Sequence, residues 1–324
     1  MAMERLASSG AMGRILVTRH LPPGGLDPLA GHELVQRGRD LPFAHDELVA
    51  AVATVDAVVC LLTDRIDAEV IAAAPRLRAI GNVAVGFDNV DLGAAARAGV
   101  AVCNTPGVLD ETTADVAFGL VLAASRLFGE AERDLRAGRW HGWGINQYLG
   151  RDVHGATLGL VGYGRIGRAV ARRASGFGMR VLHHARTPTG EPGYVGSLDE
   201  LLAGADVVSL HVPLSATTRH LIGRRELDLM KPSAVLVNTA RGPVVDEEAL
   251  AEALESGRVF AAGLDVFEHE PRVSPRLLAA PRTVLLPHVG SGSLQTRTRM
   301  ARTAAEGVRA VLAGERPGNL VTLP

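Results

Sequence analysis

Residues 156–170, "ATLGLVGYGRIGRAV", join a hydrophobic run to the start of a helix through three closely spaced glycines. The apolar run predicts a buried strand, and the pattern G-x-G-x-x-G over 162–167 opens the helix that follows. Glycines at this spacing permit a tight turn and a close approach of backbone to a pyrophosphate, while the helix N-terminus attracts negative charge. The pattern alone is weak evidence in a chain with 37 glycines. Its position between a strand and a helix predicts a dinucleotide-binding βαβ unit.

Short runs rich in Val, Leu and Ile alternate with helical stretches along the rest of the chain, which predicts parallel β/α units. One series of strands is expected near 14–19, 56–62, 77–83 and 99–105, and a second near 156–162, 179–185, 206–212, 233–240, 259–267 and 283–288. We therefore expect an α/β protein with two doubly wound parallel-sheet domains, a flavodoxin-like substrate domain and a Rossmann cofactor domain.

Two longer helices are expected to connect these domains. Residues 112–128 are apolar on nearly all sides, which predicts a buried bridging helix capped near Asp110 or Thr112. Residues 293–315 are amphipathic, with Met300, Ala304, Val308 and Val311 on one stripe. We expect this last helix to return to the first domain. The predicted domains are 1–104 plus 291–324, with 1–12 as a flexible extension, and 105–290.

Composition excludes several classes of protein. The chain has 324 residues, 34 Lys and Arg and 35 Asp and Glu, for a formal charge of -1, and no basic and aromatic cluster suggests nucleic acid as a partner. No apolar stretch of about 18 residues lacks polar breaks, so no membrane span is expected. Cys60 and Cys103 sit in apolar runs, typical of buried thiols in a reducing compartment. The sequence thus predicts a cytoplasmic protein, and it suggests no metal site.

Three polar residues follow predicted strands of the second series: Arg241, Glu270 and His288. In an open parallel sheet, ligands bind outside the carboxyl ends of the strands, so these side chains are expected to converge. A guanidinium pairs with a carboxylate, an imidazole exchanges a proton near neutral pH, and a neighbouring carboxylate orients the imidazole and favours its protonated form. Together, beside a dinucleotide loop, they predict a catalytic site.

Each of these residues also has a structural interpretation. Taken alone, Arg241 could form an ion pair, Glu270 could be a solvated loop acid, and His288 a strand-end histidine. Asp265 lies on a predicted strand, where an indirect structural role is as reasonable as direct chemistry. The neighbours of Glu270, Glu268 and His269, are expected to be exposed.

Residues 181–190, "VLHHARTPTG", end the second strand of the nucleotide-binding half. NAD-dependent chains place Asp or Glu at this strand end, where it binds the ribose hydroxyls and repels a 2′-phosphate. Here Ala185 stands at that position and Arg186 follows it. A guanidinium can bind phosphate through two hydrogen bonds, so NADPH is the predicted cofactor. If Arg186 is only a solvated surface side chain, the alternative is a site that is indifferent between NADPH and NADH.

The sequence resembles the D-isomer-specific 2-hydroxyacid dehydrogenase family, and within it the glyoxylate and hydroxypyruvate reductases. The resemblance covers almost the whole chain after the first dozen residues. It rests on the segments "NVAVGFDNVD", "NTPGVLDETTADVAFGLVLAASR", "GRDVHGATLGLVGYGRIG", "SLHVPLSATTRHLI", "VNTARGPVVDEEAL", "GLDVFEHEP" and "LLPHVGSGS", in the family's order.

The resemblance implies a role for each site residue. Arg241 would bind the substrate, Glu270 would pair with His288, and His288 would donate the proton in carbonyl reduction. Backbone N–H groups of Val85 and Gly86 would bind the substrate carboxylate from the first domain, which would make domain closure part of catalysis; a plain strand-to-helix turn is the alternative for them. Leu62 and Trp143 would shape the pocket. The implied cofactor-binding residues are Gly162, Tyr163, Gly164, Arg165, Ile166, Gly167, Ala185, Arg186, Thr187, His211, Val212, Pro213, Thr217, Thr239, Ala240, Arg241, Asp265, His288 and Gly290.

The expected activity is reduction of a small 2-oxo acid, glyoxylate or hydroxypyruvate, to the D-2-hydroxy acid with NADPH. An NAD-dependent enzyme of the phosphoglycerate dehydrogenase type is one alternative, and a dinucleotide-binding corepressor of the same fold is another. A phosphite dehydrogenase is less compatible, because that family has lysine where Val85 stands. A homodimer is expected, because related reductases use a stretch like 139–150 at their dimer interface; for Trp143 plain packing is the alternative to reaching a neighbouring subunit.

Overall fold

The computed structural model describes residues 12–38 and 40–322. The chain divides into two compact units, one ending at Leu109 and resuming at Gly292, the other spanning Asp110–Ser291. The first boundary lies five residues beyond the predicted one, at 109 instead of 104, and the second lies one residue beyond it, at 291 instead of 290. The predicted extension at 1–12 falls outside the described residues except for Met12.

The first unit is built on a five-stranded parallel sheet with the strand order β2-β1-β3-β4-β5. Its elements are β1 (Arg14–Val17), η1 (Asp27–Leu29), β2 (Glu33–Gln36), α1 (His45–Val52), β3 (Ala57–Cys60), α2 (Ala68–Ala72), β4 (Ala79–Asn82), α3 (Leu92–Ala98), β5 (Ala101–Cys103) and α11 (Leu294–Leu312). The strand β2 is not among those predicted from the sequence.

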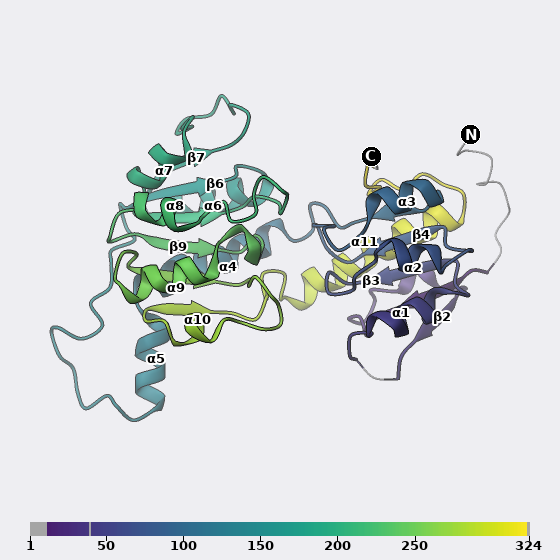
Figure 1. Ribbon diagram of the computed structural model, residues 1–324, viewed down its shortest axis with the longest axis horizontal. Helices are drawn as coiled ribbons and strands as arrows, with labels where there is room; N and C mark the ends of the chain where they lie inside the picture. The colour runs from purple at the N-terminus through teal and green to yellow at the C-terminus, as the bar shows by residue number, and fades with distance from the viewer. Residues whose placement is uncertain (1–11, 39, 323–324) are drawn as a thin grey trace. The chain divides into compact units, whose positions relative to one another are not determined.

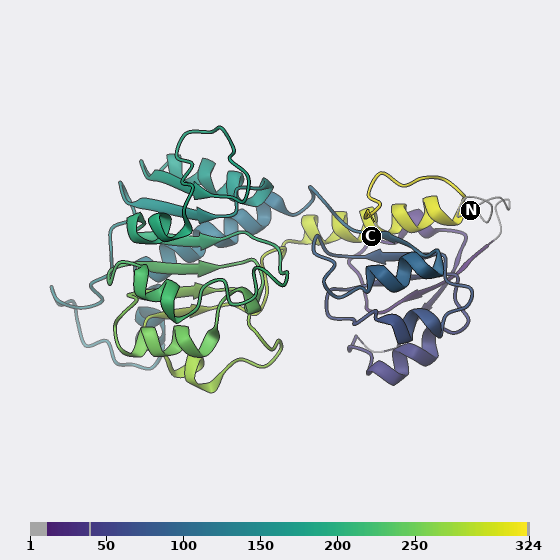
Figure 2. The same ribbon diagram turned by 45° about the horizontal axis from the view of Figure 1, so that its top comes forward.

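Helices cover both faces of this sheet (Figures 1 and 2). Side chains of α1, α2 and α3 pack with Val58 and Ile80 in one apolar core, while α11 packs along the other face. Gly81 on β4 permits this second contact, because a Cβ there would lie 2.8 Å from Val308 and 3.0 Å from the carbonyl oxygen of Ala304. The predicted stripe of α11 is confirmed as its buried face, since Met300, Ala304, Val308 and Val311 are all buried.

The second unit is built on a six-stranded parallel sheet with the strand order β11-β10-β9-β8-β6-β7. Its elements are α4 (Asp110–Ser125), α5 (Phe128–Arg136), β6 (Thr157–Val161), α6 (Arg165–Ser175), β7 (Arg180–His184), α7 (Leu198–Gly204), β8 (Val207–Leu210), α8 (Arg224–Leu229), β9 (Val235–Asn238), η2 (Gly242–Val244), α9 (Glu247–Glu255), β10 (Ala261–Leu264), α10 (Pro275–Ala279) and β11 (Thr283–Leu285).

Successive side chains of a central strand point to opposite faces, and both faces are buried here. Val235 and Val237 of β9 pack with α4 and α6, whereas Leu236 packs in the core formed with α7, α8 and α9. The predicted doubly wound architecture is confirmed, with all six strands ending at the same edge of the sheet.

Within the described residues, no single helix is long and apolar enough to cross a bilayer. Only α4 and α5 pass such a test as a pair, across a bend of 69°. In this structure α4 is a core helix, with Ala117, Leu120 and Val121 buried.

Candidate active site

The glycine loop between β6 and α6 has the geometry that a dinucleotide phosphate requires. Gly162 has φ +95°, which L side chains rarely adopt, and a Cβ there would lie 2.5 Å from the carbonyl oxygen of His211. A Cβ on Gly167 would lie 2.4 Å from the carbonyl oxygen of Gly162, so helix and strand pack closely. Gly164 faces open space. The residues therefore fit a pyrophosphate placed at the N-terminus of α6.

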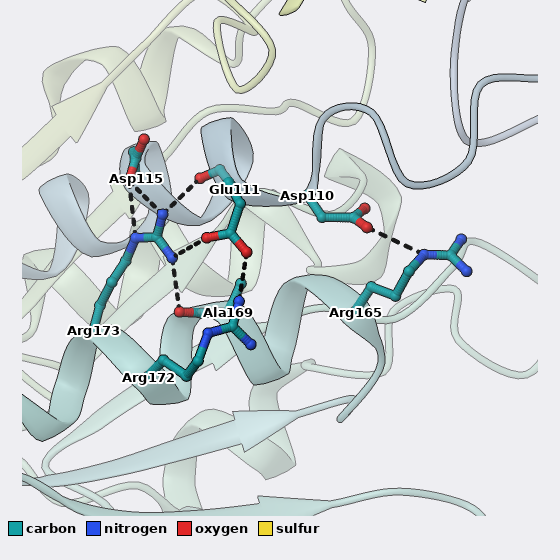
Figure 3. A network of polar contacts seen from close by, with 7 residues as sticks. All are labelled: Asp110, Glu111, Asp115, Arg165, Ala169, Arg172 and Arg173. Carbon is teal, nitrogen blue, oxygen red and sulfur yellow. Dashed lines mark hydrogen bonds and ion pairs between the residues drawn. The ribbon is translucent and has the colours of Figure 1, made fainter. Parts of the chain in front are cut away.

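Arginines of α6 are tied to acids at the start of α4 (Figure 3). Arg165, inside the glycine loop, pairs with Asp110 at 3.2 Å, and Arg173 pairs with both Glu111 and Asp115. Burial raises the pKa of the Asp110 carboxyl, and the charge of Arg165 opposes that rise. Asp110 thus orients a loop arginine that the sequence assigned to the cofactor, a contact that the capping interpretation of Asp110 did not include.

The end of β7 carries Ala185 and Arg186, as the sequence predicts, and no acid takes the expected position. Arg186 is exposed and forms no ion pair with any described residue. In the same strand, the His183 ring stacks on Tyr163 at 3.7 Å, and its Nε2 lies 2.7 Å from the Thr189 hydroxyl. These contacts anchor the loop after β7 to the glycine loop.

The other predicted cofactor residues follow β8 and β9. His211 lies 2.9 Å from the Ser209 hydroxyl, and burial lowers its pKa to about 4, so its ring is neutral at pH 7. The Thr239 hydroxyl is buried without a hydrogen-bond partner among the described residues, a state that costs free energy unless a ligand or water completes it. The remaining residues of this set lie in strand-end loops: Val212, Pro213 and Thr217 after β8, Ala240 after β9, and Thr187 after β7.

Arg241 follows β9 and has an extended backbone, which the last residue of that strand holds through hydrogen bonds. The Asn238 side chain donates to the Arg241 carbonyl at 2.9 Å and accepts from the Ala240 N–H at 3.0 Å. The next residue, Gly242, packs so closely on Phe267 that a Cβ there would lie 1.8 Å from the Phe267 carbonyl carbon. The half-buried guanidinium is therefore carried by a rigid backbone.

Glu270 and His288 form the predicted pair. The Nδ1–H of His288 donates to Glu270 Oε2 at 2.8 Å, while the N–H of Phe267 donates to the other carboxylate oxygen at 3.0 Å. Burial opposes ionisation of Glu270, but the hydrogen bond and charge of His288, with the Phe267 N–H and the Arg241 charge, outweigh it and lower its pKa. The His288 Nε2 has no partner among the described residues, so this atom can donate a proton to a ligand.

Asp265 fixes the backbone beyond the histidine. Its buried carboxylate accepts hydrogen bonds from the N–H groups of Val289 and Gly290, both at 2.7 Å. His288 itself has φ +53°, a conformation that a residue with a side chain adopts at a cost. Burial raises the pKa of Asp265, opposed by these two hydrogen bonds and by His288. Of the two roles left open by the sequence, these contacts give Asp265 the structural one.

The expectation of an exposed Glu268 is wrong. Its side chain is only 13% exposed and accepts a hydrogen bond from His220 at 2.6 Å, because the turn before Glu270 folds it back against the loop after β8. His269 is exposed, as predicted.

The predicted carboxylate-binding residues belong to the first unit. Val85 and Gly86 are half-buried in the loop after β4, and Leu62 is half-buried in the loop after β3. Both loops therefore lie at the carboxyl edge of that unit's sheet.

Comparison with known proteins shows the family of the chain. The family described as D-isomer specific 2-hydroxyacid dehydrogenase, NAD binding domain, matches residues 118–290. A glyoxylate reductase of Korarchaeum cryptofilum is 49% identical over 318 residues, which is 95% of each chain. The chain belongs to the D-isomer-specific 2-hydroxyacid dehydrogenase family.

Solved structures are similarly close. The TT0316 protein of Thermus thermophilus is 48% identical with a TM-score of 0.91, covering 95% of this chain and all of that one. An NADPH-dependent glyoxylate/hydroxypyruvate reductase of Sinorhizobium meliloti, in complex with NADP and malonate, is 36% identical with a TM-score of 0.86, covering 96% and 97%.

Proposed function

We propose that the protein uses NADPH to reduce glyoxylate to glycolate, and hydroxypyruvate to the D-isomer of its 2-hydroxy acid. The observation that carries this proposal is the His288–Glu270 pair at 2.8 Å, at the strand edge that also presents Arg241 and the glycine loop. The names of the Korarchaeum and Sinorhizobium relatives support the substrate class.

In the proposed mechanism, the Arg241 guanidinium and the Val85 and Gly86 amides bind the 2-oxo acid. A reduced dinucleotide held by the glycine loop 162–167 would supply the hydride that the carbonyl carbon needs. The His288 Nε2–H donates a proton to the carbonyl oxygen while Glu270 stabilises the imidazolium before transfer. Arg241 offsets the negative charge that develops on the oxygen.

The preference for NADPH rests on the end of β7. An acid at this position would repel a 2′-phosphate, and Ala185 removes that repulsion. The exposed Arg186, which no described acid neutralises, supplies the positive charge. The Sinorhizobium relative, which is an NADPH-dependent enzyme, supports the same choice of cofactor.

The protein is further proposed to act as a cytoplasmic homodimer. Cys60 and Cys103 are free and buried, which suits a reducing compartment. Exposed apolar side chains gather on α5 and the segment after it, as expected of a surface that a second subunit covers.

A substrate panel at fixed NADPH tests the proposed function. We expect kcat/KM to be higher for glyoxylate and hydroxypyruvate than for phenylpyruvate, with pyruvate below hydroxypyruvate. His288→Asn should bind NADPH normally and lower kcat by about 10²- to 10⁴-fold, the contribution of a general acid. Higher kcat/KM for a bulky 2-oxo acid, or wild-type turnover by His288→Asn, would contradict the proposal.

A further inference from the structure

The loop after β4 turns two successive backbone carbonyls toward the end of β5. The Ala84 carbonyl accepts a hydrogen bond from the Thr105 N–H at 2.9 Å, and the Val85 carbonyl accepts one from the Asn104 side-chain amide at 2.8 Å. Successive carbonyls of an extended strand point in opposite directions, so these two bonds mark a departure from strand geometry.

This departure fixes where the next two amides point. In a trans peptide the N–H lies opposite the carbonyl, so the N–H groups of Val85 and Gly86 both point away from the end of β5. Neither donates a hydrogen bond to any described residue. Two adjacent N–H groups on one side of a turn form an anion-binding concavity, suited to the two oxygens of a carboxylate.

Side chains at both ends hold the turn. The buried Asn82 donates to the Gly86 carbonyl at 2.9 Å and exchanges hydrogen bonds with Asn89 at 3.1 and 3.2 Å. Asn104 provides the only side-chain bond to the Val85 carbonyl among the described residues. The orientation of the Gly86 N–H, which belongs to the same peptide, therefore depends directly on Asn104.

A segment more than two hundred positions away holds Asn104 in turn. Its N–H donates to the Asn319 carbonyl at 3.2 Å, and the Asn319 side chain donates to the Asn104 carbonyl at 2.8 Å. The same Asn319 amide also reaches the Thr303 carbonyl of α11 at 3.0 Å. The segment after α11 thereby fixes Asn104, whose side chain orients the turn at Val85 and Gly86.

We infer that Asn104 is a positioning residue for substrate, which aims the Val85 and Gly86 amides at the 2-oxo acid carboxylate and is itself held by Asn319. This inference rests on the proposed function. It predicts a loss in substrate binding rather than in cofactor binding, because the glycine loop belongs to the other unit.

The experiment measures steady-state kinetics of Asn104→Ala and Asn104→Asp with glyoxylate and NADPH, together with binding of oxamate, a carboxylate-bearing analogue. Aspartate keeps the size of the side chain but cannot donate when ionised. We expect both variants to raise the KM for glyoxylate and the Kd for oxamate by about tenfold or more. This is the effect expected when a misaligned amide loses its hydrogen bond to a charged carboxylate. The KM for NADPH should stay within about twofold, and Asn319→Ala should change the glyoxylate KM in the same direction but less.

Val102→Ala is the matched control, because it removes buried apolar volume from β5, the strand just before Asn104, without changing a side chain that holds the turn. It should lower Tm while leaving the glyoxylate KM unchanged. An unchanged KM in Asn104→Ala, or an equal rise in Val102→Ala at equal loss of Tm, would overturn the inference while leaving the proposed function intact. A wild-type protein that reduces no 2-oxo acid would instead overturn the proposed function, and this inference with it.

Discussion

The imidazole of His288 is fixed from two directions by carboxylates with different tasks. Glu270 contacts the ring itself, whereas Asp265 contacts only the two amides that follow it. The lowered pKa of Glu270 keeps that group charged near neutral pH, where it favours a protonated ring. Asp265 instead compensates for the unfavourable backbone of His288. Glu270 thus favours a proton on the ring, and Asp265 fixes the position of the ring.

Replacing Glu270 with Gln tests this division. The neutral amide retains the size of the side chain but no longer carries the charge that attracts a protonated ring. Since reduction needs the protonated ring, the alkaline limb of the kcat/KM profile with glyoxylate should move to lower pH. Measured from pH 5 to 10, the rate at the acidic end should fall much less than the rate at the alkaline end.

Asp265→Asn serves as the comparison for that variant. The amide leaves one of the two N–H groups after His288 without its acceptor and so displaces the ring, which should lower kcat at the acidic as well as at the alkaline end of the pH range. A shift of the alkaline limb toward higher pH in Glu270→Gln would contradict the role assigned to the carboxylate.

The sequence could predict which residue types follow which strands, and therefore Arg241, Glu270 and His288, because position along a strand and chemical class are both local properties. It could not predict that Glu268 turns inward to His220, or that Asn319 braces Asn104. Those contacts join residues far apart in the chain, and neither partner lies in a motif that reveals the other.

Among the strands, β7 is the one whose end we propose to select the cofactor. Its last residues place Ala185 and Arg186 beside the glycine loop, and the stacked His183 and Tyr163 rings connect the two segments. Arg186→Ala should lower kcat/KM with NADPH, but not with NADH, by a factor that corresponds to about 1 to 3 kcal/mol. This is the scale of a charge-assisted hydrogen bond. Ala185→Asp should shift preference toward NADH.

Comparing kcat/KM for NADPH and NADH in wild type and both variants checks this prediction. Arg172→Ala is a suitable control, because it removes an exposed arginine of α6 that pairs with Glu111 rather than facing the strand end. Wild type that prefers NADH, or equal losses with both cofactors in Arg186→Ala, would show that this strand end does not read the 2′-phosphate.

The strand β2 shows where pattern-based prediction fails. Its four residues, Glu33–Gln36, are largely exposed, and it lies at the edge of its sheet. Central strands read as continuous apolar runs because both faces are buried, whereas this strand contributes only two apolar residues. A strand is recognised in a sequence by the apolar residues that its burial requires. An exposed edge strand needs few of them and is therefore hard to recognise.

Across the chain, the two-unit architecture could be predicted because each unit repeats the same alternation of apolar strand and helix. The stripe on α11 correctly indicated a helix with one buried face. The limits of each unit were less accurate, since the loop between β5 and α4 has no composition change at Leu109. The boundary between the two units depends on which residues each end of the loop contacts, and the amino-acid composition does not reveal those contacts.

An assembly is suggested by one part of the second unit. The helix α5 has no buried residue, and it leads into a long segment that Figures 1 and 2 show extending away from the body of its unit. Exposed apolar side chains of this region are Phe128, Leu135, Trp140, Trp143, Ile145 and Leu149. Large exposed aromatic and aliphatic groups gathered in this way mark surfaces that partners cover.

We therefore expect the protein in solution to have twice the 34.0 kDa mass of one chain. Leu135→Glu combined with Trp140→Glu should reduce that mass toward a single chain, because a dimer would have to bury the new charges. Leu278→Glu, at an equally exposed leucine of α10, should leave the mass unchanged. Sedimentation equilibrium over a range of concentrations measures all three. A wild-type protein that remains monomeric throughout, or a double variant that still dimerises as tightly as wild type, would place the interface elsewhere or exclude it.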